Sequence, residues 1–112
     1  MRIGWRPLAV LLMIVVPISY VATSAYVGMK RRTAYDAIKV GDPASFVITQ
    51  FGQPSVREEP EHPFFRYATS KCQSPCVERL WFENRLALDT EAWSVSLGSD
   101  GTVVEKYHWV SP

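Results

Sequence analysis

The pattern of apolar positions separates an N-terminal stretch from the rest of the chain. Residues Leu8 to Gly28 include no charged side chain. As a helix rising about 1.5 Å per residue, this stretch is long enough to cross the roughly 30 Å hydrocarbon core of a bilayer. Basic residues flank it, and aromatic residues suited to the membrane interface lie near its ends: Arg2, Arg6, Lys30, Arg31 and Arg32, with Trp5, Tyr20 and Tyr26. We therefore predict a membrane anchor over residues 1–32 and a folded domain over residues 33–112.

A cleaved signal peptide is the main alternative to an uncleaved anchor. Small residues at Thr23 and Ala25 make a passable cleavage site after Ala25, and cleavage there would release a secreted or periplasmic domain. The apolar run is long for a signal peptide, and this length favours the anchor. Two arginines precede the run, and one lysine and two arginines follow it, so charge alone does not decide the orientation of the anchor.

Two short helices are predicted after the anchor. The first is Thr33–Val40, with Thr33 as its cap, Asp36 in a capping-box position and Gly41 at its end. The polar cap and the following glycine are the usual signals of a new helix start and stop.

The second helix has stronger boundary signals. Asp42 is a good N-cap, and Pro43 suits the first helical position, where its missing N–H is not needed. Gly52 can adopt the left-handed conformation that closes a helix, and Pro54 prevents its continuation. The apolar side chains between these boundaries follow the i, i+3, i+4, i+7 spacing of one helical face: Ala44, Val47, Ile48 and Phe51.

The remainder of the chain has β character. After a proline-broken acidic loop at Ser55–Pro63, the predicted strands are 64–69, 76–83, 92–98 and 102–110, with an Asp-Gly hairpin turn at Ser99–Gly101. Alternation places Leu80 and Phe82 opposite Val77, Arg79 and Trp81, and it places Trp93, Val95 and Leu97 inward with Ser94 and Ser96 outward. The fold class expected is α+β, with two short helices packed on one face of a three- to four-stranded antiparallel sheet.

Composition and motifs narrow the function. The 112 residues suffice for one small domain plus an anchor, and the formal net charge of +1 gives no basic surface for nucleic acid. The chain has no Gly-rich phosphate loop, nucleophile elbow or His-Glu-x-x-His motif. We therefore predict no catalytic site, no cofactor and no small-molecule substrate.

The two cysteines, Cys72 and Cys76, favour a structural disulfide that closes a tight loop. A disulfide indicates an oxidising compartment, which places the domain outside the cytoplasm and the N-terminus inside. Reduced structural thiols and a redox-active pair are the alternatives, although the spacing departs from Cys-x-x-Cys and no βαβ pattern surrounds it. A zinc site recruiting His62 and His108 matches no standard ligand spacing, so no metal is predicted.

Two clusters of side chains remain. The acidic cluster Glu58, Glu59 and Glu61 is expected to be solvated rather than catalytic, with His62 exposed beside it. The second cluster is a candidate partner-binding patch if the second face of the sheet is uncovered. The alternative is that the residues of this cluster belong to the core. Aromatic and arginine side chains of this kind are typical of binding hot spots: Arg79, Trp81, Tyr107 and Trp109.

A family resemblance is carried by Ile38-x-x-Gly41, by Val47-x-x-x-Phe51-Gly52-x-Pro54, and by the hairpin that ends in "DGTVVEKYHW". This pattern, spanning about Thr33 to Trp109, resembles the BamE-like (SmpA/OmlA) family. The resemblance implies a helix–helix–three-strand fold in the bacterial cell envelope and a non-enzymatic role through protein contacts, as in outer-membrane β-barrel assembly. The matching residues set helix boundaries and packing, so the resemblance implies a fold but no active site. These residues are Gly41, Val47, Phe51, Gly52 and Pro54.

The chain departs from the best-known members of that family in two ways. It has no lipidated cysteine after the apolar run, and it has the Cys72/Cys76 pair. The expectation is therefore a single-pass bacterial inner-membrane protein with a periplasmic domain over 33–112 that acts as a binding or scaffolding module in envelope or outer-membrane assembly. The alternatives are a thiol–disulfide redox protein and a small accessory subunit that contacts a membrane complex through its transmembrane helix.

Overall fold

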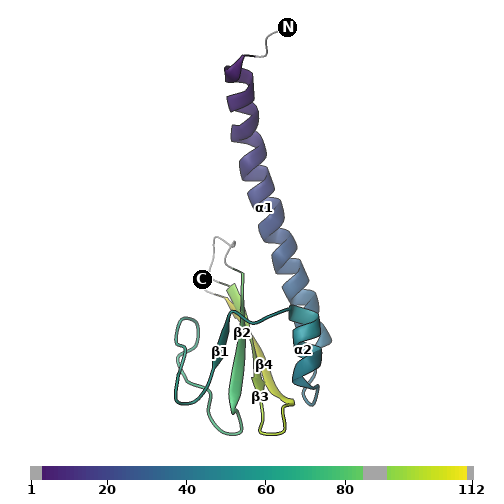
Figure 1. Ribbon diagram of the computed structural model, residues 1–112, viewed down its shortest axis with the longest axis vertical. Helices are drawn as coiled ribbons and strands as arrows, with labels where there is room; N and C mark the ends of the chain where they lie inside the picture. Colours follow the sequence, from purple (N-terminus) through teal and green to yellow (C-terminus); the bar gives the residue numbers. More distant parts are fainter. Residues whose placement is uncertain (1–3, 85–90, 111–112) are drawn as a thin grey trace.

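The computed structural model describes residues 4–84 and 91–110. Two helices and a four-stranded antiparallel sheet with the order β1-β2-β3-β4 make up these residues (Figure 1). The elements are α1 (Trp5–Ala37), α2 (Ala44–Phe51), β1 (Val56–Glu58), β2 (Glu78–Glu83), β3 (Glu91–Leu97) and β4 (Val103–Val110). The predicted α+β class and the antiparallel sheet are confirmed.

Helix α1 is continuous from the apolar segment into the folded domain. It has 33 residues and is long and apolar enough to cross a membrane, although a signal sequence has the same properties. The separate helix predicted to begin at Thr33 is wrong, since the Thr33 hydroxyl donates to the carbonyl oxygen of Met29 (2.9 Å) within the helix. No glycine or proline lies between Met29 and Ala37, so nothing interrupts the helix there. The expected anchor boundary at residue 32 consequently falls inside α1.

Helix α2 begins one residue later than its capping signals predict. Pro43 is the N-cap residue, and the Asp42 carboxylate instead accepts a hydrogen bond from the Lys39 N–H (2.8 Å) in the turn between the helices. Gly52 ends the helix, as predicted, with a positive φ of 88°, but its ψ of −162° differs from the left-handed helical conformation that was expected. Gly41, at φ 97°, lies in the turn and not at the end of α1, which is Ala37.

The helices cover one face of the sheet, here called the helix face. Leu80 and Phe82 of β2 lie on it, as their alternation predicts, and the Phe51 ring stacks on Phe82 with 4.2 Å between centroids. The main apolar core is on this face, and its buried members are Ala34, Ile38, Val47, Phe51, Leu80, Phe82, Trp93, Val95, Leu97 and Val103. The predicted inward stripes of α2, β2 and β3 therefore form one core.

One strand prediction and one loop prediction are wrong. No strand forms at 64–69, and β1 forms instead within the segment expected to be a loop. Strand β1 pairs antiparallel with β2, which sets Val56 opposite Trp81 and Glu58 opposite Arg79. The aromatic residues of 64–69 serve another purpose, because Phe64 packs edge-on against Trp81 with 5.4 Å between centroids. Aromatic side chains favour strands and buried loops alike, so composition did not separate the two.

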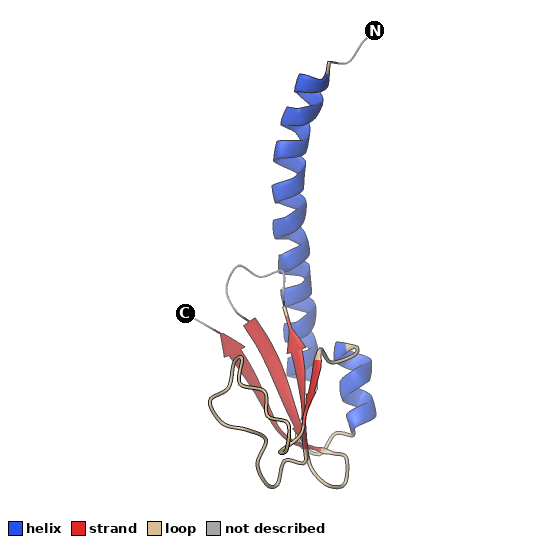
Figure 2. Cartoon of the chain, turned by 60° about the vertical axis from the view of Figure 1, so that its left-hand side comes forward, coloured by secondary structure: helices blue, strands red, loops and turns tan. Residues whose placement is uncertain are grey.

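Residues 59–77, here called the covering loop, lie over the other face of the sheet, here called the loop face. Figures 1 and 2 show this loop and the two helices on opposite sides of the sheet. Under the loop, Ala68, Trp81 and Ala92 form a second buried cluster. Ser94 and Ser96 were expected to face solvent, but both are buried because the covering loop and β4 enclose them.

Candidate groove beside the covering loop

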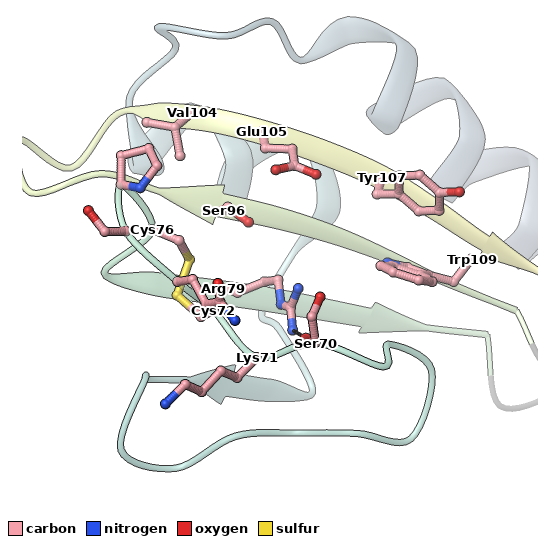
Figure 3. Close-up of a pocket in the computed structure, with 13 residues that line it drawn as sticks. Ser70, Lys71, Cys72, Cys76, Arg79, Ser96, Val104, Glu105, Tyr107 and Trp109 are labelled. Carbon is pink, nitrogen blue, oxygen red and sulfur yellow. Dashed lines mark hydrogen bonds between the residues drawn. A yellow bond between two sulfur atoms is a disulfide. The ribbon is translucent and has the colours of Figure 1, made fainter.

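A groove of about 400 Å³ lies between the covering loop and β4. In Figure 3 the Cys72–Cys76 disulfide stands at one end of it, and Tyr107 and Trp109 stand at the other. We call it the loop–β4 groove. Its lining comes from residues 70–76 of the loop and from all of the longer strands: Arg79 of β2, Ser96 of β3, and Val104, Glu105, Tyr107 and Trp109 of β4.

The four residues of the predicted partner-binding patch share the loop face but differ in exposure. Trp81 is 0% exposed and Arg79 is 8% exposed, whereas Tyr107 is 49% exposed and Trp109 is half-buried. The Trp109 indole N–H donates to the Ser94 hydroxyl (2.9 Å), and its ring lies 4.3 Å from that of Tyr107. Tyr107 and Trp109 are therefore accessible to a partner, and Trp81 belongs to the core.

Glu58 is buried beneath the groove, contrary to the expectation that the acidic cluster is solvated. Its carboxylate is 0% exposed and accepts hydrogen bonds from the Cys72 N–H (2.9 Å) and the Trp81 indole N–H (2.8 Å). Arg79 donates to the same carboxylate through Nε (2.9 Å) and Nη2 (3.0 Å). This bidentate pair satisfies both charges within the protein. Assigning β1 would have revealed the contact, since Glu58 and Arg79 are cross-strand partners.

Arg79 also holds the covering loop in place. Its Nη2 donates to the carbonyl oxygen of Ser70 (2.8 Å), and its guanidinium lies 5.0 Å from the centre of the Trp81 ring. The charged side chain of Arg79 is thus bound to neighbouring groups of the protein and forms part of the floor of the groove. The exposed charged side chains among the lining residues are Lys71 on the loop and Glu105 on β4.

Glu83 makes a second buried attachment that sequence patterns did not predict. Its side chain is 1% exposed, accepts a hydrogen bond from the Ser55 hydroxyl (2.7 Å), and accepts another from the Tyr67 hydroxyl. Tyr67 also stacks on Trp81 with 5.5 Å between centroids. Polar attachments at Glu58 and Glu83 therefore fix a long loop that has no regular secondary structure of its own.

Cys72 and Cys76 form the predicted disulfide, with 5.5 Å between their Cα atoms. Both residues are at least nine-tenths buried. His62 is exposed, as expected, whereas His108 lies on the helix face, stacked on Trp93 and 3.1 Å from a Glu91 carboxylate oxygen. Within residues 4–84 and 91–110, no three His, Cys, Asp or Glu side chains converge to hold a metal ion.

Opening this disulfide is expected to lower the free energy of unfolding by about 2 kcal/mol, the chain-entropy value for so short a loop. Denaturant titration of the oxidised protein with and without reductant measures the difference. The Cys72→Ala/Cys76→Ala double variant is the control, because its stability should not respond to reductant. Equal stability of oxidised and reduced protein would contradict a structural role for the bond.

Two side chains with shifted pKa values lie at the helix–sheet interface, outside the groove. Burial lowers the pKa of Arg31, whose guanidinium donates to the carbonyl oxygen of Phe51 at the end of α2. Burial, and then the negative charge of Asp36, raise the pKa of Tyr35. In both side chains the largest cause is burial where α1 packs against the domain.

The groove is thus a concave surface with an aromatic end, a disulfide-closed end and one exposed charge of each sign. Among its lining side chains there is no pairing of a nucleophile with a general base. A concave surface of this kind can bind a ligand or a segment of another protein. Comparison of the chain with protein-family models, with curated proteins and with solved structures finds no match.

Proposed function

We propose that this chain is a single-pass membrane protein of the bacterial envelope whose C-terminal domain is a non-enzymatic protein-binding module. The observation that carries the binding role is the loop–β4 groove, in which Tyr107 is 49% exposed beside Trp109. Aromatic side chains in a concave site are the usual anchors of protein interfaces. The resemblance to the BamE-like family supports a role in envelope or outer-membrane assembly, and that membership stays a prediction.

The contacts of α1 support an uncleaved anchor over a signal peptide. The Asn84 amide donates to the carbonyl oxygen of Ser24 (3.3 Å), and Gly28 is buried against the same side chain. Cleavage after Ala25 would remove Ser24 and leave Asn84 without this partner. No residue from Trp5 to Thr23 is buried, and the uncharged part of this stretch, Pro7–Thr23, provides about 25 Å of helix for the bilayer.

The disulfide supports the orientation. Cys72 and Cys76 lie in the domain that follows the anchor, and a structural disulfide persists in an oxidising compartment. We therefore propose an inner-membrane protein with its N-terminus in the cytoplasm and its domain in the periplasm. The orientation is tested with a Ser99→Cys variant and a cysteine-reactive probe that does not cross membranes. The probe should label the exposed turn in intact spheroplasts. Labelling that occurs only after lysis would show that the domain lies in the cytoplasm.

The binding role is tested at Tyr107. Tyr107→Ala is expected to reduce partner capture about tenfold or more in the native envelope, measured by crosslinking and quantitative mass spectrometry, because a central aromatic anchor contributes about 2 kcal/mol. Its stability should stay close to that of the unmodified protein. Phe65→Ala is the matched control, since Phe65 is 56% exposed and does not line the groove. Equal capture by the Tyr107 and Phe65 variants would refute the assignment.

The two alternative functions predict different results. An accessory subunit that acts through its anchor would lose its partner when residues 5–23 are replaced by an unrelated apolar helix, whereas a groove-binding module would keep it. A thiol–disulfide enzyme would lose activity in the Cys72→Ala/Cys76→Ala variant even if that variant still folds and binds. The proposed function predicts that the partner is retained when the anchor is replaced, and that the Cys72→Ala/Cys76→Ala variant keeps its function as long as it folds and binds.

A further inference from the structure

We infer that the outer edge of β4 binds an extended segment of a different protein, which adds to the sheet as a further strand. This inference rests on the proposed protein-binding role of the loop–β4 groove. Strand β4 is eight residues long and is the last strand in the sheet order. Over residues 104–110 its main-chain hydrogen bonds to described residues go to β3 alone. A long unpaired edge is a template for another strand.

The chain itself already pairs with the first residue of this edge. The Val103 N–H donates to the carbonyl oxygen of Asp42 (2.8 Å), and the Val103 carbonyl accepts from the Gly41 N–H (2.8 Å). The segment runs antiparallel to β4, with Pro43 opposite Thr102, and then turns away into α2. The outer edge of β4 therefore accepts strand pairing where a segment reaches it, and beyond that point none of the residues that the structure describes pairs with it.

The usual protection of a free edge is weak here. A lysine on an edge strand commonly projects past the edge and discourages pairing. Lys106 instead donates through Nζ to the carbonyl oxygen of Tyr35 (2.7 Å), and its ammonium lies 4.2 Å from the centre of the Tyr35 ring. Lys106 is thus held against the helices. The bulge in the pairing lies at Ser96/Leu97, opposite the start of β4, so the pairing of the later residues is regular.

The groove indicates the chemistry of the added strand. Glu105, Tyr107 and Trp109 alternate along β4 and all point to the loop face, where they line the groove. Every second side chain of an added strand would lie beside them, over a space of about 400 Å³. We therefore expect an extended partner segment with a large apolar or aromatic side chain at alternate positions.

A second copy of this chain does not fit the edge. Strand β4 runs close to the direction of α1 in both views (Figures 1 and 2). Antiparallel pairing of two β4 strands across a twofold axis would point the two α1 helices in opposite directions. Two copies anchored in one membrane cross it in the same direction, so antiparallel pairing of two copies is excluded. Parallel pairing of two copies would keep the anchors aligned but is the less stable arrangement, and we therefore assign the edge to a different chain.

Site-specific photo-crosslinking of the full chain in its native membrane tests the inference. A photoreactive phenylalanine analogue is placed singly at Glu105 or at Tyr107, with Phe65 as the control position outside the groove. Both β4 positions should crosslink to one segment of one partner, at sites two residues apart, and the Phe65 position should not. Crosslinks from β4 that show no such spacing overturn the added strand but leave the binding role intact. The absence of crosslinks from both β4 positions overturns the two together.

A synthetic peptide of the crosslinked segment provides the second measurement. N-methylation of alternate amides on the side facing β4 should weaken its binding to the detergent-solubilised protein about tenfold or more, because several main-chain hydrogen bonds are lost. Methylation of the intervening amides, which would face away from β4, is the matched control and should leave affinity nearly unchanged. Equal effects of the two methylated peptides would overturn the inference.

Discussion

Replacement of Glu58 by glutamine is expected to lower the free energy of unfolding by about 3–5 kcal/mol, the range for breaking a buried ion pair. The carboxylate is 0% exposed and receives hydrogen bonds from Arg79, Trp81 and the Cys72 main chain. A neutral amide would leave the Arg79 guanidinium charged and buried without a counterion. The amide would also have one acceptor where the carboxylate has two, so at least one donor would lose its partner.

Chemical denaturation of Glu58→Gln and Glu61→Gln measures this effect. Glu61 lies three residues away on the surface, so its variant makes the same chemical change without a buried partner. Its stability should match that of the unmodified protein. A Glu58→Gln protein as stable as the Glu61→Gln protein would show that the buried pair does not form in solution.

A double-variant cycle separates the ion pair from the other contacts. Arg79→Met alone should also be costly, because it leaves the Glu58 carboxylate buried without its cation. The Glu58→Leu/Arg79→Met protein should lose less stability than the sum of the two single variants, since neither charge remains uncompensated. Additive losses would indicate that the two side chains act independently, in conflict with their 2.8 Å closest approach.

Local sequence signals predicted the elements whose boundaries are set locally. Helix α2 was found because Gly52 and Pro54 end it and because its apolar stripe packs on a single face. Strands β2 and β3 were found from alternation, which also assigned Leu80 and Trp81 to opposite faces. The predicted cap at Thr33 failed because a threonine hydroxyl can equally bond the carbonyl four residues earlier inside a helix.

The covering loop and the buried glutamates could not be predicted in the same way. Strand β1 has three residues, too few to show a period, and its assignment depends on pairing with β2. The burial of Glu58 depends on Arg79 and Trp81, more than twenty residues further along the chain. Whether an acidic side chain is solvated or buried is decided by such distant partners, and a local acidic cluster does not contain that information.

Replacement of Trp81 by alanine is expected to lower the free energy of unfolding by about 3–5 kcal/mol, as for large aromatic residues in a core. The Trp81 ring lies within 5.4 to 5.8 Å, between centroids, of the rings of Phe64, Tyr67 and Trp109. Removing it would leave a cavity under the covering loop and take a hydrogen bond from Glu58. The loss should appear in chemical denaturation as a fall in the midpoint.

Trp109→Ala provides the comparison, since Trp109 is half-buried and lines the groove. Its smaller burial should make its effect on stability smaller, while its effect on partner capture should be comparable to that of Tyr107→Ala. If the Trp81→Ala protein does not fold, Trp81→Phe keeps one aromatic ring in the cluster and removes the N–H donor to Glu58 together with part of the buried ring system, and the lost donor alone should cost about 1–3 kcal/mol.

The opposite outcome for Trp81 would change the account of the groove. A Trp81→Ala protein with unchanged stability and lost partner capture would mean that Trp81 is reached directly by the partner. The covering loop would then have to leave the sheet in solution, breaking the attachments of Arg79 to Ser70 and of Tyr67 to Glu83. Because those attachments are polar and partly buried, opening them is costly, and we therefore expect the loss of stability.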